Sequence, residues 1–283
     1  MIKDIYFKKK LASSWFLLLQ EIVCNEFQKI EIDFGKKTNK RPKYFKNKNW
    51  KKPFNKGGGK YAIIKDGLLF DSVGVNFSEV SGKFTKKFKN QIPGLNKQLN
   101  YWASGISVVA HMKNPKIPAM HFNTRFICTQ KSWFGGGIDA TPSLKNLDQK
   151  KYFHSELKKM CNKHNKHYYA KYKKWCDEYF YLPHRNEARG IGGIFFDYKM
   201  DDWEKDFSFV RDVGTTFDFL LNKMIRENMH SKWTKKDKEI QLMKRGRYVE
   251  YNLLYDRGTK FGLNSGGNTE AILMSMPPEA RWK

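Results

Sequence analysis

Five polar side chains alternate with apolar ones along two neighbouring stretches of the chain. In GISVVAH, Ser107 and His111 share one face if the stretch is a strand, because side chains alternate with period two. In AMHFNTRF, the same alternation places His121, Asn123 and Arg125 on one face. Hydroxyl, imidazole, amide and guanidinium groups together can transfer protons, ligate a metal and bind a carboxylate. The segment between them contains Asn-Pro, which is typical of a turn.

A hairpin of these two strands would bring the polar side chains together. We expect an antiparallel pair in which His111 lies opposite His121 and Ser107 lies opposite Arg125. Arg125 then needs a carboxylate partner, because an unpaired buried guanidinium is costly. That partner is either an internal Asp or Glu, or a ligand carboxylate held by charge-assisted hydrogen bonds worth about 1.5–3 kcal/mol each.

Three glycines and an aspartate follow in WFGGGIDATP, where we expect a strand that leads into a glycine-rich bend. Gly135, Gly136 and Gly137 permit close approach of the backbone to a ligand. No P-loop lysine follows them, which argues against a nucleotide site. Asp139 could bind N–H donors or act as a base, or it could be a turn residue that caps the next segment. The residues alone leave both interpretations open.

The histidines form no recognised metal-binding motif. His111 and His121 share a strand face, whereas His154 and His184 flank a long aromatic helical stretch. A site built from several histidines would suit a first-row divalent metal. The spacing H-E-x-x-H is absent, however, and a single histidine is more often a hydrogen-bonded structural residue than a ligand.

The composition indicates a globular protein with a basic surface. The 22 Phe, 14 Tyr and 8 Trp among 283 residues are enough for a packed core and too many for a disordered chain. A formal net charge of +26 suggests an acidic partner such as nucleic acid, an anionic membrane or a polyanionic small molecule. Lysines scattered in short runs are equally typical of a solvated surface. Four cysteines without a C-x-x-C pair fit reduced thiols in a reducing compartment.

The remaining pattern predicts an α+β fold in a single domain over residues 1–283. Apolar residues at helical spacing predict an amphipathic N-terminal helix, and no apolar run reaches the roughly 20 residues of a membrane span. A polar, lysine-rich surface segment over 33–58 precedes a hairpin that turns at Asp66-Gly67. We expect a large, mostly antiparallel sheet with helices on both faces.

The predicted elements are spread along the whole chain. Helices are expected over 147–181, with a break near 162–165, and over 202–230. Further strands are expected over 105–112, 119–130, 190–198, 248–258 and 270–277.

Long blocks of sequence resemble the oxygen-dependent coproporphyrinogen III oxidase family. They run in the family's order over 74–82, 107–126, 133–142, 172–197 and 246–282, while residues 1–56 match only loosely. The resemblance implies an oxidoreductase of porphyrin and haem biosynthesis. Such an enzyme converts two propionates of coproporphyrinogen III to vinyls, giving protoporphyrinogen IX and releasing carbon dioxide and hydrogen peroxide. It implies molecular oxygen as co-substrate and no organic cofactor, in agreement with the absence of a dinucleotide fingerprint.

The resemblance also implies roles for individual residues. His121 matches the family's proton donor, and Asp139 matches an aspartate that engages the pyrrole N–H groups. The positions that match substrate-binding residues are Ser107, Asn123, Thr124, Arg125, Gly266, Gly267 and Asn268. The positions that match ligands of a divalent metal, with manganese as the expected ion, are His111, His121, His154 and His184.

One position departs from the family, and two other functions stay open. An arginine is usual in place of Asn268, so a charge-assisted contact to a propionate is lost here or supplied by Lys260 or Arg257. The resemblance implies a homodimer with its contact largely within 248–283, a cytoplasmic location, no nucleic-acid partner and no insertion into a membrane. The alternatives are a basic nucleic-acid-binding protein and a relative that carries tetrapyrroles without turnover. Aerobic conversion of coproporphyrinogen III separates the enzyme from both.

Overall fold

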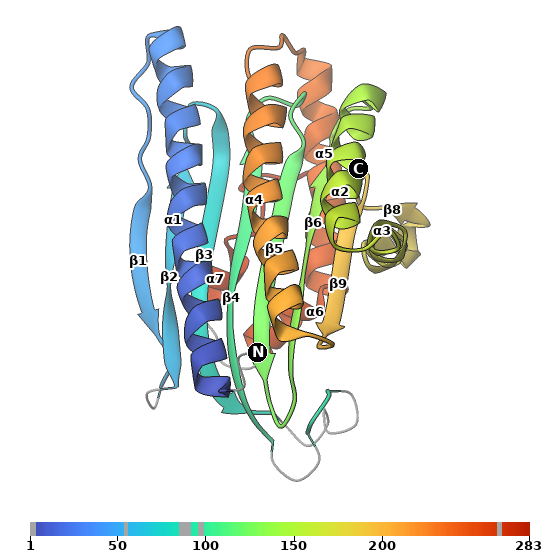
Figure 1. Cartoon of the computed structure of the whole chain (residues 1–283). Coiled ribbons are helices and arrows are strands. Elements are labelled where there is room, and N and C mark those ends of the chain that lie inside the picture. The colour runs from blue at the N-terminus through green and yellow to red at the C-terminus, as the bar shows by residue number, and fades with distance from the viewer. Residues whose placement is uncertain (1–3, 54–55, 85–91, 96–98, 265–267) are drawn as a thin grey trace.

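A seven-stranded antiparallel sheet divides the molecule into two helical layers (Figure 1). The structure is a computed structural model that describes residues 4–53, 56–84, 92–95, 99–264 and 268–283. The strand order is β1-β2-β3-β4-β5-β6-β9, and each strand pairs antiparallel with its neighbours. The predicted α+β class, with a large antiparallel sheet and helices on both faces, is confirmed.

The elements have the following bounds. The strands of the large sheet are β1 Lys46–Lys51, β2 Gly57–Lys65, β3 Phe70–Lys83, β4 Asn100–Met112, β5 Ala119–Cys128, β6 Ser132–Thr141 and β9 Gly193–Lys199. A small ribbon consists of β7 Tyr181–Leu182, the 3-10 turn Pro183–Arg185 and β8 Glu187–Ala188. The helices are α1 Ile5–Thr38, α2 Leu147–His164, α3 Tyr168–Tyr179, α4 Trp203–Asn228, α5 Lys235–Leu254, α6 Arg257–Asn264 and α7 Thr269–Leu273.

The main core lies between one face of the sheet and helices α1, α2 and α4 (Figure 1). Alternation along β4 and β5 sends Val108 and Phe122 to this face, where both are fully buried. Phe122 stacks on Phe217 of α4 with ring centroids 4.8 Å apart. Helix α1 contributes Phe16 and Val23, which recur at helical spacing. The bulky apolar side chains of the central strands are thereby kept on this face, and the polar ones project from the other.

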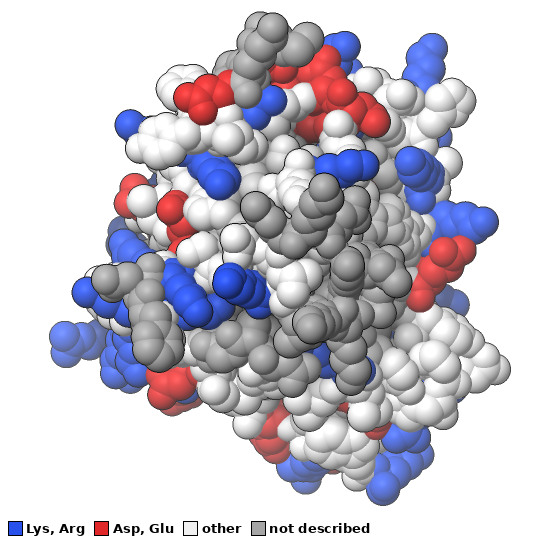
Figure 2. Space-filling view, turned by 90° about the horizontal axis from the view of Figure 1, so that it is seen from below, with Lys and Arg blue, Asp and Glu red and all other residues white. Residues whose placement is uncertain are grey.

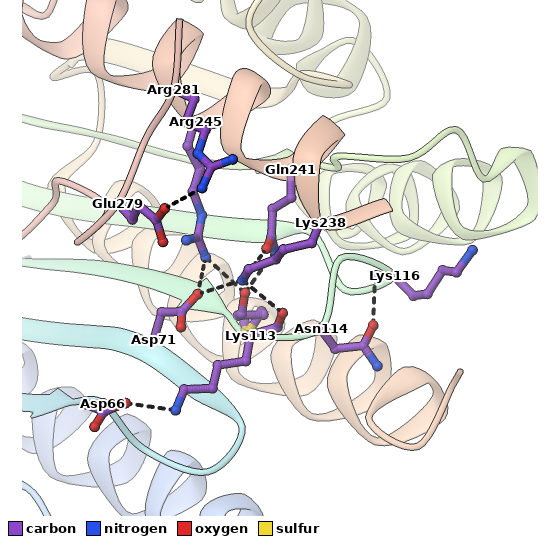
Figure 3. A network of polar contacts seen from close by, with 11 residues as sticks. Asp66, Asp71, Lys113, Asn114, Lys116, Lys238, Gln241, Arg245, Glu279 and Arg281 are labelled. Carbon is purple, nitrogen blue, oxygen red and sulfur yellow. Dashed lines mark hydrogen bonds and ion pairs between the residues drawn. The ribbon is translucent and has the colours of Figure 1, made fainter. Parts of the chain in front are cut away.

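Helix α5 covers part of the other face and is fixed there by a polar network (Figure 3). Arg245 donates to the carboxylate of Asp71 at 2.5 Å and to the carbonyl of Met112 at 2.9 Å. Gln241 donates to the same carbonyl at 2.8 Å. Lys238 adds a contact of 3.3 Å to Asp71. The buried end of β4 thus has its last carbonyl satisfied by side chains of α5, which sets the helix against β3 and β4.

Several predicted elements are confirmed. The N-terminal helix forms, with Asp4 as its N-cap, and the hairpin turns at Asp66, which adopts a positive φ of 51°. The break between the helices of 147–181 falls where α2 ends at His164 and α3 begins at Tyr168. Within the described ranges, no helix has both the length and the apolarity needed to cross a bilayer.

Other segments fold differently from the prediction. The polar segment over 33–58 is partly regular, because α1 continues to Thr38 and β1 forms the sheet edge. The expected strands over 248–258 and 270–277 are helical instead. Tyr248, Tyr251 and Tyr255 recur every three or four residues, which is helical spacing that a strand prediction overlooks. The glycines of 135–137 lie within β6 and form no bend.

The register between β4 and β5 differs by two residues from the prediction. Ser107 pairs with Asn123, and His121 pairs with Val109, so the expected pairs His111–His121 and Ser107–Arg125 are wrong. The connection closes early, because Asn114 forms a tight turn in which the Ile117 amide donates to its carbonyl at 3.2 Å. A shift of two residues leaves every side chain on its predicted face.

Basic side chains are spread over the surface. Figure 2 views the molecule from below, and lysine and arginine side chains lie on several sides of this end with acidic side chains among them. Elsewhere, Lys113 pairs with Asp66 at 2.8 Å and Lys223 with Glu227 at 2.7 Å. This distribution is typical of a solvated surface and gives no continuous basic groove in this view.

Candidate functional site

Arg125 and Asn123 project from a part of the sheet that is otherwise lined by small residues. Directly paired residues share a face of a sheet. The residues paired with Arg125 and Asn123 on β4 and β6 are Gly105, Gly135, Ser107 and Gly137. The two long polar side chains therefore stand beside a low floor of small residues.

A directional chain of hydrogen bonds runs along this face of β5. Arg125 donates from Nη1 to Oδ1 of Asn123 at 3.0 Å. A guanidinium can only donate, so this contact fixes the orientation of the Asn123 amide. Its Nδ2 then faces Nε2 of His121 at 3.3 Å. Since the amide nitrogen donates, Nε2 of His121 must be the acceptor, and the ring carries its hydrogen on Nδ1.

His121 Nδ1 meets Asp139 at 2.6 Å, and the two residues pair directly across β5 and β6. The N–H of Nδ1 donates to Oδ1 of the carboxylate, which holds the tautomer that the Asn123 contact requires. The His121 side chain is 18% exposed, whereas that of Asp139 is 3% exposed. The arrangement makes Nε2, which accepts from Asn123, the basic nitrogen of a partly exposed side chain, with a buried carboxylate that can stabilise the ring after it takes up a proton.

Arg189 forms the other contact of the buried carboxylate. It donates from Nη2 to Oδ2 of Asp139, and its side chain is 2% exposed. The guanidinium carbon lies 4.0, 4.6 and 4.9 Å from the ring centroids of Phe180, Tyr248 and Tyr251. Contacts with three aromatic faces and one carboxylate therefore offset the hydration energy that this cation loses on burial.

The charge of Asp139 is set by two opposing effects. Burial by itself raises the pKa of its carboxyl group. The guanidinium of Arg189 and the imidazole of His121 lower it by attraction and by hydrogen bonding, and the net pKa lies below the usual range. Asp139 is consequently ionised at neutral pH. Its two oxygens are engaged by His121 and Arg189, and of these two groups only His121 can act as an acid or base.

Arg125 already has an internal carboxylate partner, as one of the two sequence-based interpretations required. Its Nη2 donates to Asp197 of β9 at 2.7 Å, and the Asp197 side chain is 10% exposed. The Arg125 side chain is 30% exposed. Of the five N–H donors of a guanidinium, two have partners among the described residues, so the others are available to a ligand carboxylate.

Gly135 gives the Arg125–Asp197 pair its space. A Cβ at this position would lie 2.5 Å from Oδ1 of Asp197 and 2.9 Å from Nη2 of Arg125. Gly135→Ala should therefore displace the guanidinium and lower kcat/KM for a carboxylate-bearing substrate by about 10-fold to 100-fold, the equivalent of one charge-assisted hydrogen bond. Steady-state kinetics of the folded variant would test this.

Gly258→Ala serves as the control for that substitution. Its Cβ would meet only the carboxylate of Asp256, at 3.3 Å or more, and kcat/KM should stay within about 2-fold of the wild-type value. Unchanged kinetics for Gly135→Ala would contradict a role for the position of Arg125.

The predicted substrate-binding residues are only partly brought together. Ser107 lies beside Asn123 on the site face. The Thr124 side chain is fully buried on the face that packs against the helices, because alternation turns it away from Arg125, and the substrate-binding role of this position stays a prediction. Asn268 caps α7 by accepting from the amide of Ala271 at 2.9 Å. Gly266 and Gly267 lie outside the described residues.

The four predicted metal ligands have separate surroundings. His154 of α2 contacts the Ile191 carbonyl and the Tyr169 hydroxyl, at 2.9 and 3.0 Å. His184 of the 3-10 turn contacts Glu250 and Tyr255, at 2.8 and 2.9 Å.

His111 of β4 contacts the carbonyl of Ser275 at 2.9 Å, and burial lowers its pKa to about 3. His121 has protein partners at both ring nitrogens. In the part of the chain that the structure describes, no group of three or more His, Cys, Asp or Glu is arranged to hold a metal. The described residues therefore do not fit a shared metal site.

Two residues of the site were missed by the sequence-based interpretation. Arg189 lies before β9 and Asp197 lies within it, 50 and 72 residues from their partners along the chain. A signal existed for both, because a buried arginine and a buried aspartate each require a partner of opposite charge. The identity of those partners depends on the pairing of β6 with β9, which no local pattern specifies.

Comparison with known proteins agrees with this geometry. The family model described as coproporphyrinogen III oxidase matches residues 12–283. Proteins named oxygen-dependent coproporphyrinogen-III oxidase from Rickettsia bellii (strain RML369-C) and Rickettsia rickettsii (strain Sheila Smith) are each 50% identical over 275 residues. The alignments cover 97% of this chain and 98% of each relative. The resemblance noted in the sequence is thus confirmed, and the chain belongs to the coproporphyrinogen III oxidase family.

Proposed function

We propose that this chain catalyses the oxygen-dependent oxidative decarboxylation of two propionates of coproporphyrinogen III to vinyls. The observation that carries the proposal is the directional chain from Arg125 through Asn123 to His121, set over small residues of the sheet. It offers a donor for a carboxylate at one end and a base of fixed tautomer at the other. Family membership supports the same substrate.

Arg125 and Asn123 are proposed to hold and orient a propionate. The spare N–H donors of the guanidinium suit bidentate binding of a carboxylate. Ser107, on the neighbouring strand, offers a further hydroxyl beside Asn123. Holding the carboxylate while its carbon skeleton lies over the glycine floor would fix the β C–H bond relative to the rest of the macrocycle.

His121 is proposed to move the proton, and Asp139 to keep His121 in the required tautomer. In each of the two decarboxylations, the β C–H bond and the bond to the carboxylate carbon break, and the vinyl double bond forms. The hydrogen and its electron pair pass to dioxygen, which needs one proton to become hydrogen peroxide. Once the substrate takes the place of the Asn123 amide beside it, His121 Nε2 can accept a pyrrole N–H proton as oxygen attacks the electron-rich ring and return a proton afterwards, with Asp139 stabilising the imidazolium between these steps.

We propose that no organic cofactor takes part, since the sequence has no dinucleotide fingerprint. A divalent metal fits poorly with the described histidines, whose ring nitrogens are largely occupied by protein partners. No step above is assigned to a metal. The tetra-anionic substrate is consistent with a basic protein, and a cytoplasmic location is consistent with four free cysteines.

A homodimer formed through the C-terminal region is part of the proposal. Leu253, Leu254 and Trp282 are each 50% exposed. Apolar side chains exposed to this extent in one region of the sequence are typical of a subunit contact. Light scattering after size-exclusion chromatography measures the mass directly, and a monomer at micromolar concentration would contradict this part.

Aerobic turnover tests the proposed function. Purified protein is incubated with coproporphyrinogen III in air and under nitrogen, and the products are oxidised and separated by their porphyrin fluorescence. We expect protoporphyrin only in air, with one dioxygen consumed and one carbon dioxide released per vinyl. Binding without turnover would favour a carrier, and the absence of oxygen-dependent product would overturn the enzyme. Parallel reactions with a chelator and with added manganese measure any dependence on metal.

A further inference from the structure

A small cavity lies beside the proposed site, between the ends of the central strands and α5. The residues that line it include His111, Ala119, Thr141, Arg245 and Tyr248. It has about 10 Å³ for the centre of a water-sized molecule, which is close to the least that one water needs. Arg245 is held from its other side by Asp71, in the network that fixes α5 (Figure 3).

His111 presents an unpaired acceptor in this buried place. Its Nε2 lies 2.9 Å from the carbonyl of Ser275, and a carbonyl can only accept, so Nε2 carries the hydrogen. Nδ1 of the neutral ring is therefore a bare lone pair. It is fully buried and has no hydrogen-bond partner, and the His111 residue is 1% exposed. The ring of Tyr248, edge-on at 5.0 Å, holds the imidazole in this orientation.

Thr141, which lines the same cavity, carries a second unpaired polar atom. Its Oγ1 is buried without a partner, and the residue is 5% exposed. A buried acceptor without a donor costs about 1–3 kcal/mol, so both atoms should be satisfied by something that fits the space. Dioxygen cannot donate a hydrogen bond, and no metal-ligating group of three side chains occurs among the described residues. A water molecule can donate to Nδ1 and also bond with the threonine hydroxyl.

We propose that His111 is a structural latch that binds one ordered water together with Thr141, and that it is not a metal ligand. Nε2 ties the backbone of Ser275, which follows α7, to strand β4. The neighbouring Met274 packs closely on Gly74, because a Cβ added to Gly74 would lie 2.7 Å from the Met274 sulfur. The water joins the ends of β4 and β6 beneath α5. The latch holds the C-terminal segment against the sheet next to the buried Arg189, which contacts the same Tyr248 ring.

A double-mutant cycle tests the shared water, because the cycle detects coupling between two side chains. Thr141→Val should lower the melting temperature by about 2–4 °C, as expected for losing one buried hydrogen bond. In a His111→Phe background the same change should have less than half that effect, since Nδ1 no longer holds the water. His111→Gln provides a second background if the phenylalanine variant does not fold.

Thr124→Val is the matched control. Thr124 Oγ1 is also buried without a partner, but on the opposite face of the sheet. Its replacement should not lower the melting temperature, and its effect should be the same with His111 or Phe at position 111. Equal effects of Thr141→Val in both backgrounds would overturn the shared water.

Metal binding is the second readout. Manganese titration by calorimetry should give the same result for wild-type protein and for the His111 variant. Loss of a stoichiometric manganese site in the His111 variant alone would overturn the latch. A crystal structure of the wild-type protein should show density for one water within hydrogen-bond distance of both Nδ1 and Oγ1, and an empty cavity would also overturn the proposal.

Discussion

Asp139→Asn is expected to lower kcat for coproporphyrinogen III by about 10²-fold to 10⁴-fold, the scale of general acid–base catalysis. Arg189 can only donate, so it should retain the oxygen of the new amide. The amide nitrogen would then face Nδ1 of His121 and donate to it. His121 would have to carry its hydrogen on Nε2, where the substrate requires an acceptor. The substitution is nearly isosteric, so the loss would report the tautomer and not the shape of the site.

The interpretation depends on the variant being folded. Asp139→Asn leaves Arg189 with a weaker partner and should lower the melting temperature, so the double variant Asp139→Asn/Arg189→Met is measured beside it. Removing both members of a buried pair is far less costly than removing one. We expect the double variant to be more stable than the single one and equally inactive. The exposed Asp201→Asn is the control, with normal kcat. Near-normal turnover of folded Asp139→Asn would refute the role of the carboxylate.

Arg189→Met is expected to reverse the pH dependence that Asp139 contributes to stability. In the wild-type protein the pKa of Asp139 is lowered, so its contribution is complete above the unfolded pKa of about 3.9 and is lost as the pH falls through the lower folded value. Without Arg189, burial dominates and the folded pKa lies above the unfolded one. The variant should then gain stability from Asp139 as the pH falls from the raised value toward about 4.

The same substitution should affect stability and activity together at neutral pH. An uncompensated buried charge costs about 3–5 kcal/mol, which urea unfolding between pH 4 and pH 8 would measure. Protonation of Asp139 would also move the acid limb of the kcat profile to higher pH. Arg281→Met is the control, because that side chain is 59% exposed beside Glu279 and should change neither curve by much. If the free energy of unfolding varies with pH in the same way for wild type and Arg189→Met, then Arg189 does not control the pKa of Asp139.

Local alternation was sufficient to predict the face of each residue in the central strands, but not their register. The period of two placed His121, Asn123 and Arg125 on the same face, and the structure agrees because one side of the sheet is buried against helices. Register depends on where the connection closes, and the turn at Asn114 shortens it. Since the predicted register was wrong by an even number of residues, the side chains lie on the predicted face, but the predicted cross-strand pairs do not form.

Contacts between distant segments could not be predicted from pattern. Asp197 and Arg189 come from β9 and the residues before it, and their side chains reach β5 and β6 only after the sheet has formed. The aromatic run around Tyr251 was ambiguous because it suits a strand by propensity and a helix by spacing. The sequence likewise does not distinguish a structural histidine from a metal ligand. The role of each histidine became clear only from the groups that its ring nitrogens contact.

The charges along the proposed site sum to zero in the free protein. Arg125 and Arg189 contribute two positive charges, and Asp139 and Asp197 contribute two negative ones. A propionate that binds at Arg125 therefore brings an unbalanced negative charge close to His121. While His121 holds the proton that it takes from the substrate, the propionate and Asp139 would both attract the imidazolium. On this account the substrate itself would supply part of the electrostatic field that keeps the proton at His121 until it completes hydrogen peroxide.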